Sequence, residues 1–121
     1  MKIAISAQGS RPEDLVDPRF GRARWFIIVN QDTGDWTAHD NSTNVEASGG
    51  AGVQAGTTVA SHGVSAVITG NVGPNAHKVL AAAGIAIHQV GNGVKVSEAI
   101  EAFKRGELPT VDAPTVSGHW S

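Results

Sequence analysis

The stretch Trp25-Phe26-Ile27-Ile28-Val29, followed by Asn30-Gln31-Asp32-Thr33-Gly34-Asp35, decides the class of fold. A continuous apolar run rich in β-branched and aromatic residues is typical of a strand in a sheet that is covered on both faces. The Asn-, Asp- and Gly-containing segment after it predicts a hairpin turn, and residues 36–40 are the expected returning strand. Upstream, residues 2–7 form another expected strand, which ends at Gln8-Gly9-Ser10.

Downstream of the hairpin the pattern changes to alternating helices and strands. Residues 41–50 are rich in Asn, Ser and Gly and are expected to form a loop. The helices are recognised by apolar residues at helical spacing, by a proline or serine at the start and by a glycine behind. The expected elements are a helix over 52–62, a strand over 65–69, a helix beginning at Pro74, a strand over 85–88 and a helix capped by Ser97.

The predicted fold is α/β, with a five-stranded mixed sheet and three helices in the order β-β-β-α-β-α-β-α. A chain of 121 residues has the size of one domain. We expect a single domain over residues 1–108. Residues 109–121 contain two prolines and no periodicity, so they are expected to form a flexible tail.

Composition excludes several classes of function. Hydrophobic residues make up 40% and charged residues 17% of the chain, which is typical of a folded domain. The formal net charge of −2 argues against non-specific nucleic-acid binding. No apolar run is long enough to cross a membrane, and the N-terminus lacks the pattern of a signal peptide, so a cytoplasmic protein is expected.

The sequence contains no cysteine. This excludes disulfides, thiolate catalysis and Cys-ligated zinc or iron–sulfur sites. Any metal must therefore be held by histidine, carboxylate or backbone groups, or must arrive as a pre-formed cluster with its own ligands.

The order of elements predicts where a ligand would bind. Right-handed crossovers place the strand at 65–69 beside the first strand and parallel to it, which creates a topological switch point. All three helices then begin at the same end of the sheet, where their free N–H groups attract anions. Four arginines (Arg11, Arg19, Arg22 and Arg24) precede the second strand, in a loop that opens at the same end. The sequence predicts an anion-binding end.

Other chemistries are supported less well. The Gly49–Gly52 run lacks both the Lys-Ser/Thr of a Walker motif and the GxGxxG spacing, and taken alone it is a flexible connection. No two histidines have the i, i+4 spacing of a helical metal site; His77, in the first turns of a helix at the ligand end, is the candidate for contact with a metal cluster. A nuclease would need carboxylates on the first strand, and residues 2–7 contain none.

Several motifs, in this order along the chain, resemble the dinitrogenase iron–molybdenum cofactor biosynthesis family. The resemblance covers residues 1–108, and the strand start with Ser6-Ala7-Gln8-Gly9, together with the absence of cysteine, is similar to the orange proteins of sulfate-reducing bacteria. The motifs are Met1-Lys2-Ile3-Ala4-Ile5-Ser6, Asp17-Pro18-Arg19-Phe20-Gly21-Arg22-Ala23, Asp40-Asn41, Gly50-Ala51-Gly52, Val67-Ile68-Thr69-Gly70-Asn71-Val72-Gly73-Pro74 and Ala83-Gly84-Ile85.

The resemblance implies a ribonuclease-H-like three-layer fold that is used for binding and not for catalysis. It also implies a non-covalently held anionic metal–sulfur cluster, either a molybdenum–copper sulfide cluster or a related Mo/Fe–S precursor of the iron–molybdenum cofactor. Such a cluster brings its own sulfide ligands, so it needs N–H donors, cations and apolar walls. The family further implies MinD-like P-loop ATPases as partner proteins, with a link to cell division.

Carried over by position, the resemblance places the cluster at three loops, Arg19 to Arg22, Gly49 to Gly52 and Thr69 to Pro74, and leaves the tail outside the family pattern. The cluster-binding candidates are Arg19, Phe20, Gly21, Arg22, Asn41, Gly49, Gly50, Ala51, Gly52, Thr69, Gly70, Asn71, Gly73, Pro74 and Asn75, with His77 as the candidate metal ligand. The alternative function is a protein–protein interaction module in a complex with the ATPases, and a third is a hydrolase or nucleotide-dependent enzyme. A monomer is expected.

Overall fold

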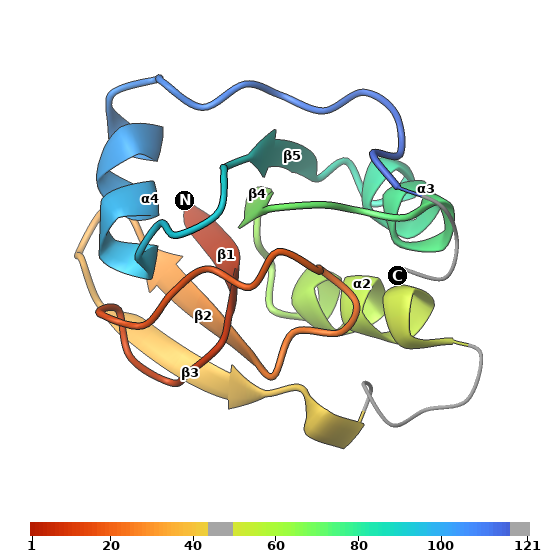
Figure 1. Cartoon of the computed structure of the whole chain (residues 1–121), viewed down its shortest axis with the longest axis horizontal. Helices are drawn as coiled ribbons and strands as arrows, with labels where there is room; N and C mark the ends of the chain where they lie inside the picture. The colour runs from red at the N-terminus through yellow and green to blue at the C-terminus, as the bar shows by residue number, and fades with distance from the viewer. Residues whose placement is uncertain (44–49, 117–121) are drawn as a thin grey trace.

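The structure, a computed structural model, describes residues 1–43 and 50–116. Five strands form one mixed sheet, and the helices α2, α3 and α4 complete the domain (Figure 1). The predicted element order is confirmed. The elements are β1 (Lys2–Ala7), β2 (Trp25–Asn30), β3 (Trp36–Asp40), α2 (Ala51–Ser61), β4 (Ala66–Thr69), α3 (Pro74–Ala82), β5 (Ala86–Gln89) and α4 (Val96–Lys104).

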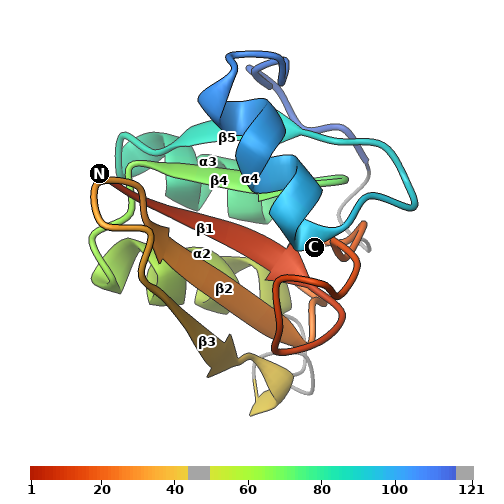
Figure 2. The same ribbon diagram turned by 90° about the vertical axis from the view of Figure 1, so that its left-hand side faces the viewer.

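The strand order β3-β2-β1-β4-β5 places β1 at the centre of the sheet. β1 pairs antiparallel with β2 and parallel with β4, and β4 pairs parallel with β5. The prediction that the first strand lies beside the fourth is therefore confirmed. Figure 2 shows β1 and β3 pointing to one side of the sheet and β2 to the other. The helices α2, α3 and α4 therefore all begin at the edge formed by the carboxyl ends of β1, β3, β4 and β5, which is the edge meant in the description of the site.

Alternation along the strands divides the core into two layers. Ala4, Phe26 and Val67 pack on one face with residues of α2 and α3, whereas Ile5 and Ile27 pack on the other with Val96 and Ala99 of α4. Both faces are covered, as Figures 1 and 2 show, which explains why the strands are continuous apolar runs. The result is the three-layer α/β fold that the resemblance implies.

The segment between β1 and β2 is more ordered than a polar loop. Val16 is buried in the α4 layer and Phe20 in the layer of α2 and α3. Val16 also pairs with Ala7 in a β-bridge, and the Asp17 N–H donates to the Ser6 carbonyl at 2.9 Å. The segment is therefore fastened to both faces of the sheet, and its path to the sheet edge is fixed.

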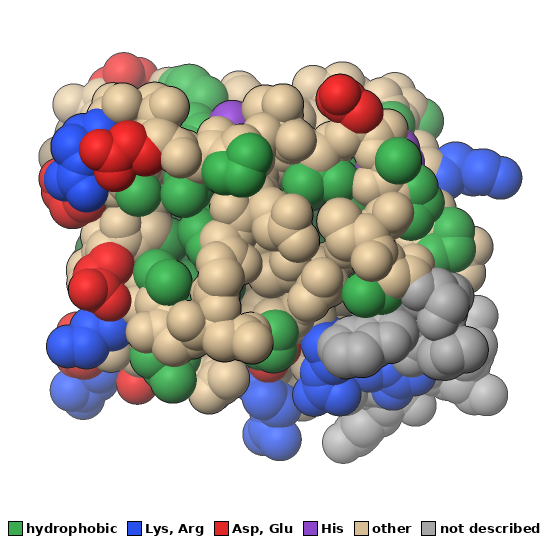
Figure 3. Space-filling view, turned by 45° about the horizontal axis from the view of Figure 1, so that its top comes forward, with side chains coloured by type: hydrophobic (Ala, Val, Ile, Leu, Met, Phe, Trp, Pro, Cys, Tyr) green, Lys and Arg blue, Asp and Glu red, His purple; other side chains and the backbone are tan. Residues whose placement is uncertain are grey.

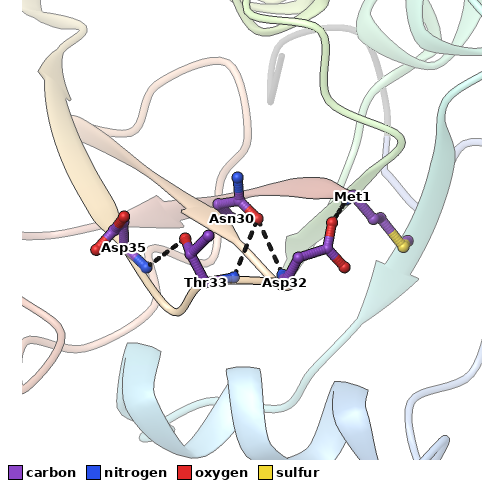
Figure 4. Close-up of polar contacts among 5 residues, drawn as sticks. All are labelled: Met1, Asn30, Asp32, Thr33 and Asp35. Carbon is purple, nitrogen blue, oxygen red and sulfur yellow. Dashed lines mark hydrogen bonds and ion pairs between the residues drawn. The ribbon is translucent and has the colours of Figure 1, made fainter.

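The hairpin between β2 and β3 is held by short-range polar contacts (Figure 4). The Asn30 side-chain oxygen accepts the N–H groups of Asp32 at 2.9 Å and Thr33 at 3.3 Å. Gly34 has a φ of 80°, the left-handed region that glycine adopts without strain. The Asp32 carboxylate also pairs with the Met1 ammonium group at 2.7 Å, which ties the chain start to the turn.

The last helix begins differently from the prediction. The sequence favoured Ser97 as its cap, but α4 starts at Val96 and its N-cap is Lys95. The Ser97 N–H instead donates to the Pro12 carbonyl at 2.8 Å. The acceptor comes from a distant loop, so the serine hydroxyl is not needed as a cap, and the local sequence pattern was misleading.

The segment after residue 108 runs beside β5, the outer strand of the sheet, although the sequence predicted a flexible tail there. Gln89 donates its N–H to the Pro109 carbonyl at 3.1 Å, and Val111 donates to the Ile87 carbonyl at 2.8 Å. Val111 also packs against the core layer of α2 and α3. This part of the expected tail is paired with β5, and residues 117–121 lie outside the described residues. In the described part of the chain, no helix has the length and apolarity of a membrane span.

Candidate functional site

The predicted ligand loops meet at the sheet edge where the helices begin. The segment after β1 and the loop after β4 are joined by their backbones: Arg19 and Asn71 form a parallel β-bridge, and the Phe20 N–H donates to the Asn71 carbonyl at 3.1 Å. The loop that carries the arginines therefore lies directly against the start of α3. Two of the three predicted loops are in contact.

Gly70 makes this contact possible. A Cβ atom at this position would lie 2.6 Å from the Pro18 Cα and 3.0 Å from the Pro18 carbonyl oxygen. Both are backbone atoms that cannot turn aside, so only glycine allows the two loops to approach so closely. The sequence singled out Gly70 as a residue that lets a ligand come near, and the structure fills that space with Pro18.

Asn41, the residue after β3, is joined to the arginine loop. Its side chain is only 2% exposed and donates to the Ala23 carbonyl at 2.8 Å, and its N–H donates to the Arg24 carbonyl at 2.8 Å. Asn41 thus connects the end of β3 to the arginine loop. Gly49 lies outside the described residues, and Gly50 is the N-cap of α2.

Several of the predicted contact residues are buried in the frame of the site. Phe20 is fully buried and its ring lies 5.1 Å from that of Phe26. Thr69 is 1% exposed, and its hydroxyl is 2.8 Å from that of Ser6, which also donates to the Asp17 carbonyl. Such side chains hold the loops in place. The other buried members of the predicted set are Gly21, Ala51, Gly52, Gly70 and Gly73.

The arginines carry the accessible charge of this edge. Arg19 is exposed and Arg22 is half-buried, and within residues 1–43 and 50–116 neither forms an ion pair. Arg24 is exposed as well; its charge helps the hydrogen bonds from Ser42 to lower the pKa of Asp40. Guanidinium groups without a protein carboxylate partner are available to an anionic ligand.

Asp17 is the buried acid beside this loop. Its side chain is 5% exposed, and its Oδ1 accepts the Arg19 N–H at 2.9 Å. Burial raises the pKa of Asp17, and the Arg19 hydrogen bond and charge oppose that shift. The carboxylate holds the backbone of the arginine loop, and its negative charge works against anion binding at the same place.

The helix starts at this edge are not equivalent. Among residues 1–43 and 50–116, no side chain makes a cap hydrogen bond to α2 or α3, and neither helix has an acidic residue in its first turn. At α4, by contrast, the Val96 N–H donates to the Asp14 carbonyl at 2.9 Å, and the Glu98 carboxylate lies in the first turn. The sequence predicted that all three helix starts attract an anion; within residues 1–43 and 50–116, the structure shows groups that occupy the first N–H groups of α4 but none at α2 or α3.

His77 is located away from the arginines. It lines a cavity of about 310 Å³ together with residues of β5 and of the segment 110–112. Pro74 and Asn75, three and two residues before His77, are exposed at the start of α3.

Two further features were not predicted. His39 and His62 lie with their ring centroids 4.2 Å apart, and burial together with the nearby His62 lowers the pKa of His39. A cavity of about 640 Å³ lies between α4, the loop after β5 and Leu108-Pro109. The two histidines are far apart in sequence, and the cavity is lined by residues from three separate segments, so neither feature has a local sequence signal.

The fold and this edge define a three-layer α/β protein whose arginine-bearing loop is joined to the start of α3. The model of the dinitrogenase iron–molybdenum cofactor family matches residues 1–106. The chain belongs to this family, as the sequence motifs indicated.

The similarity to other proteins extends over nearly the whole chain. The apo form of the orange protein from Desulfovibrio gigas is 38% identical, with a TM-score of 0.92 over 95% of this chain and 96% of that one. A putative NifB protein from Thermotoga is 33% identical, with a TM-score of 0.83 over 95% and 97%. An uncharacterized protein from Methanocaldococcus jannaschii is 32% identical over 110 residues, 89% of each chain.

Proposed function

We propose that this protein binds an anionic metal–sulfur cluster non-covalently, at the edge where the arginine loop meets the starts of α2 and α3. The observation that carries the proposal is the backbone junction between Arg19-Phe20 and Asn71. It joins the segment that carries Arg19 and Arg22 to the loop before α3; within residues 1–43 and 50–116 neither arginine forms an ion pair and no side chain caps α3. Both features favour a negative charge, and neither requires the ligand to be bonded covalently.

The chemistry of the available donors suits a cluster that carries its own sulfides. These 121 residues include no thiolate. Guanidinium and backbone N–H groups donate hydrogen bonds to sulfide and leave the metal coordination unchanged. The buried frame built by Asn41 and Thr69 would keep these donors in place before the ligand arrives, which lowers the ordering cost of binding.

The proposed ligand is a molybdenum–copper sulfide cluster or a related Mo/Fe–S precursor. The family description names the iron–molybdenum cofactor, and a similar solved structure is an orange protein. We propose carriage of the cluster and no chemical conversion of it. A site that holds and releases a multiply charged anion should bind more weakly as salt screens the arginines.

Titration of the apo-protein with tetrathiomolybdate and Cu(I) tests this function. We expect new visible absorption bands and amide chemical-shift changes at residues 19–22, 50–52 and 69–75. Arg22→Gln should weaken binding about tenfold at low salt, since an ion pair with a dianion near the surface contributes about 1–2 kcal/mol. The matched control is Arg105→Gln, which removes the same charge from the end of α4.

Two results would reject the proposal. One is the absence of bands and shifts with the wild-type protein. The other is equal weakening by Arg22→Gln and Arg105→Gln, because a non-specific charge effect would produce it. In either case a protein-interaction role would become the leading hypothesis, to be tested by capture of a MinD-like P-loop ATPase.

A further inference from the structure

The segment after α4 ends on the loop that follows β4. The Val72 N–H donates to the Thr115 hydroxyl oxygen at 2.9 Å, and the Thr115 N–H donates to the Val72 carbonyl at 2.9 Å. The Thr115 hydroxyl also lies 3.3 Å from the Asn71 side-chain oxygen, to which it donates. One residue therefore occupies both backbone groups of Val72 and contacts the neighbouring side chain.

The same loop is held from its other side by the arginine segment and by β5. Phe20 donates its N–H to the Asn71 carbonyl at 3.1 Å, and the Gln89 side chain donates to the Gly70 carbonyl at 2.9 Å. Residues 70–72 are thus fixed between Phe20 and Thr115. A change at Thr115 would be transmitted through Asn71 to the backbone of the arginine loop.

Thr115 is brought to this position by a segment with an anchorage of its own. Residues 109–111 pair with β5, and Val111 packs on the core. No ion pair involves residues 109–116 among the described parts of the chain. Figure 3 shows the face brought forward from the top of Figure 1: its centre is uncharged, and most charged side chains lie around its margin. The attachment therefore rests on hydrogen bonds and apolar packing.

We propose that Thr115 is a positioning residue for the cluster site: its hydroxyl fixes the loop 70–73 and, through Asn71, the arginine loop. This inference rests on the proposed function for its effect on ligand binding. The matched family model ends at residue 106, so the positioning contact comes from a part of the chain beyond it.

The physical reason is the cost of an unsatisfied donor. Val72 is 1% exposed, and within residues 1–43 and 50–116 its N–H has the Thr115 hydroxyl as its only acceptor. Without that oxygen the loop must shift to satisfy the N–H, and the ligand must then restore the original arrangement on binding. Loss of the hydroxyl should consequently weaken ligand binding without any contact between Thr115 and the ligand.

The test compares Thr115→Val with Thr115→Ser. Valine keeps the shape and removes the hydroxyl, whereas serine keeps the hydroxyl. In Thr115→Val we expect the Val72 amide of the apo-protein to exchange about tenfold faster and the Phe20 amide to exchange faster as well. The same variant should bind tetrathiomolybdate with Cu(I) about three- to tenfold more weakly. Thr115→Ser should behave as the wild type.

A truncation after Ala113 separates positioning from edge pairing, because it keeps residues 109–111 and removes Thr115. It should reproduce the effect of Thr115→Val. Binding that is unchanged or tighter in Thr115→Val would overturn the inference. If the wild type binds no tetrathiomolybdate, the proposed function fails; the positioning role then fails too if the Phe20 amide exchange is unchanged in Thr115→Val, and is supported if that exchange accelerates.

Discussion

The starts of α3 and α4 lie at the same edge of the sheet but differ in the groups that contact their first N–H groups and in the charge of their first turns. At α4 the first N–H groups are used by the Pro12 and Asp14 carbonyls, and Glu98 places a negative charge in the first turn. At α3 the first residue is Pro74, no side chain in the described part of the chain caps the helix, and no acid is present in the first turn. Residues 8–24 supply the carbonyl groups that accept the first N–H groups of α4. The same segment carries Arg19, which pairs with Asn71 in the loop before α3.

This difference shows that the position of a helix start is not enough to predict an anion site. All three helices follow strands that point to the same edge, as the topology required. What distinguishes them is whether another loop already provides acceptors for the free N–H groups. The same segment, residues 8–24, accounts for both outcomes.

The largest effect is expected from Gly70→Ala, which forces the arginine loop away from α3. The added Cβ would lie 2.6 Å from the Pro18 Cα, so one backbone must move. We expect the free energy of unfolding to fall by about 1–3 kcal/mol and cluster binding to be lost. Urea unfolding and the tetrathiomolybdate titration measure these effects. The control is Gly91→Ala, where a Cβ meets nothing within 4 Å; equal destabilisation by both variants would contradict the contact.

A smaller effect is expected when the start of α3 is made to resemble that of α4. Asn75 is exposed in the first turn, and Asn75→Asp places a carboxylate there. The acid should stabilise the helix by about 0.3–1 kcal/mol and weaken the binding of a dianion by about tenfold at low salt. Thermal unfolding and titration should therefore move in opposite directions.

Asn92→Asp is the matched control for that variant. It adds the same charge at an exposed position in the loop after β5. If Asn92→Asp weakens binding as much as Asn75→Asp, the effect comes from net charge and the open start of α3 is not the site.

The smallest effect concerns Asp17 and pH. Its pKa in the folded protein is raised above the ordinary value of 3.8, so the folded state binds the proton more tightly than the unfolded state does. The stability that protonation adds is complete below 3.8 and is lost as pH rises through the folded pKa. Asp17→Asn keeps an oxygen for the Arg19 N–H and removes this dependence.

We therefore expect the unfolding free energy of the wild type to decline relative to Asp17→Asn as pH rises from below 3.8 toward neutrality. The variant should also bind the anionic probe more tightly, by a few-fold, because a negative charge near the arginines has been removed. Urea unfolding over this pH range measures the first effect. A difference between the two proteins that grows as pH falls would contradict the raised pKa.

The elements that sequence patterns predicted are those whose signals are local. Residues 25–29 are apolar throughout because both faces of β2 are covered, and Pro74 marks the start of α3 where the prediction put it. The sheet order followed from handedness rules and not from any residue pair. Boundaries differed by a residue or so, as at α2, which begins at Ala51.

The missed features depend on contacts between distant segments. Val16 and Phe20 stand among prolines and charged residues, with no periodicity to identify them as core. Thr115 lies in a Pro- and Thr-rich stretch, and its partner Val72 is separated from it by all of α3, β5 and α4. Of the predicted site residues, the arginines and Asn75 are accessible, whereas Phe20, Asn41 and Thr69 are buried because they build the frame.

The central place of β1 has a consequence for how the chain folds. On one side β1 pairs with β2, which follows it after residues 8–24, so β1, β2 and β3 make an antiparallel meander from the first 40 residues alone. On its other side Ala4 pairs with Val67, and this pairing waits until α2 has been made. Contacts of high sequence separation are slow to form, because loop closure costs entropy before they stabilise anything. We expect β1, β2 and β3 to fold quickly and β4, with the elements after it, to join β1 slowly. The edge that carries the proposed site would be complete only after this second step.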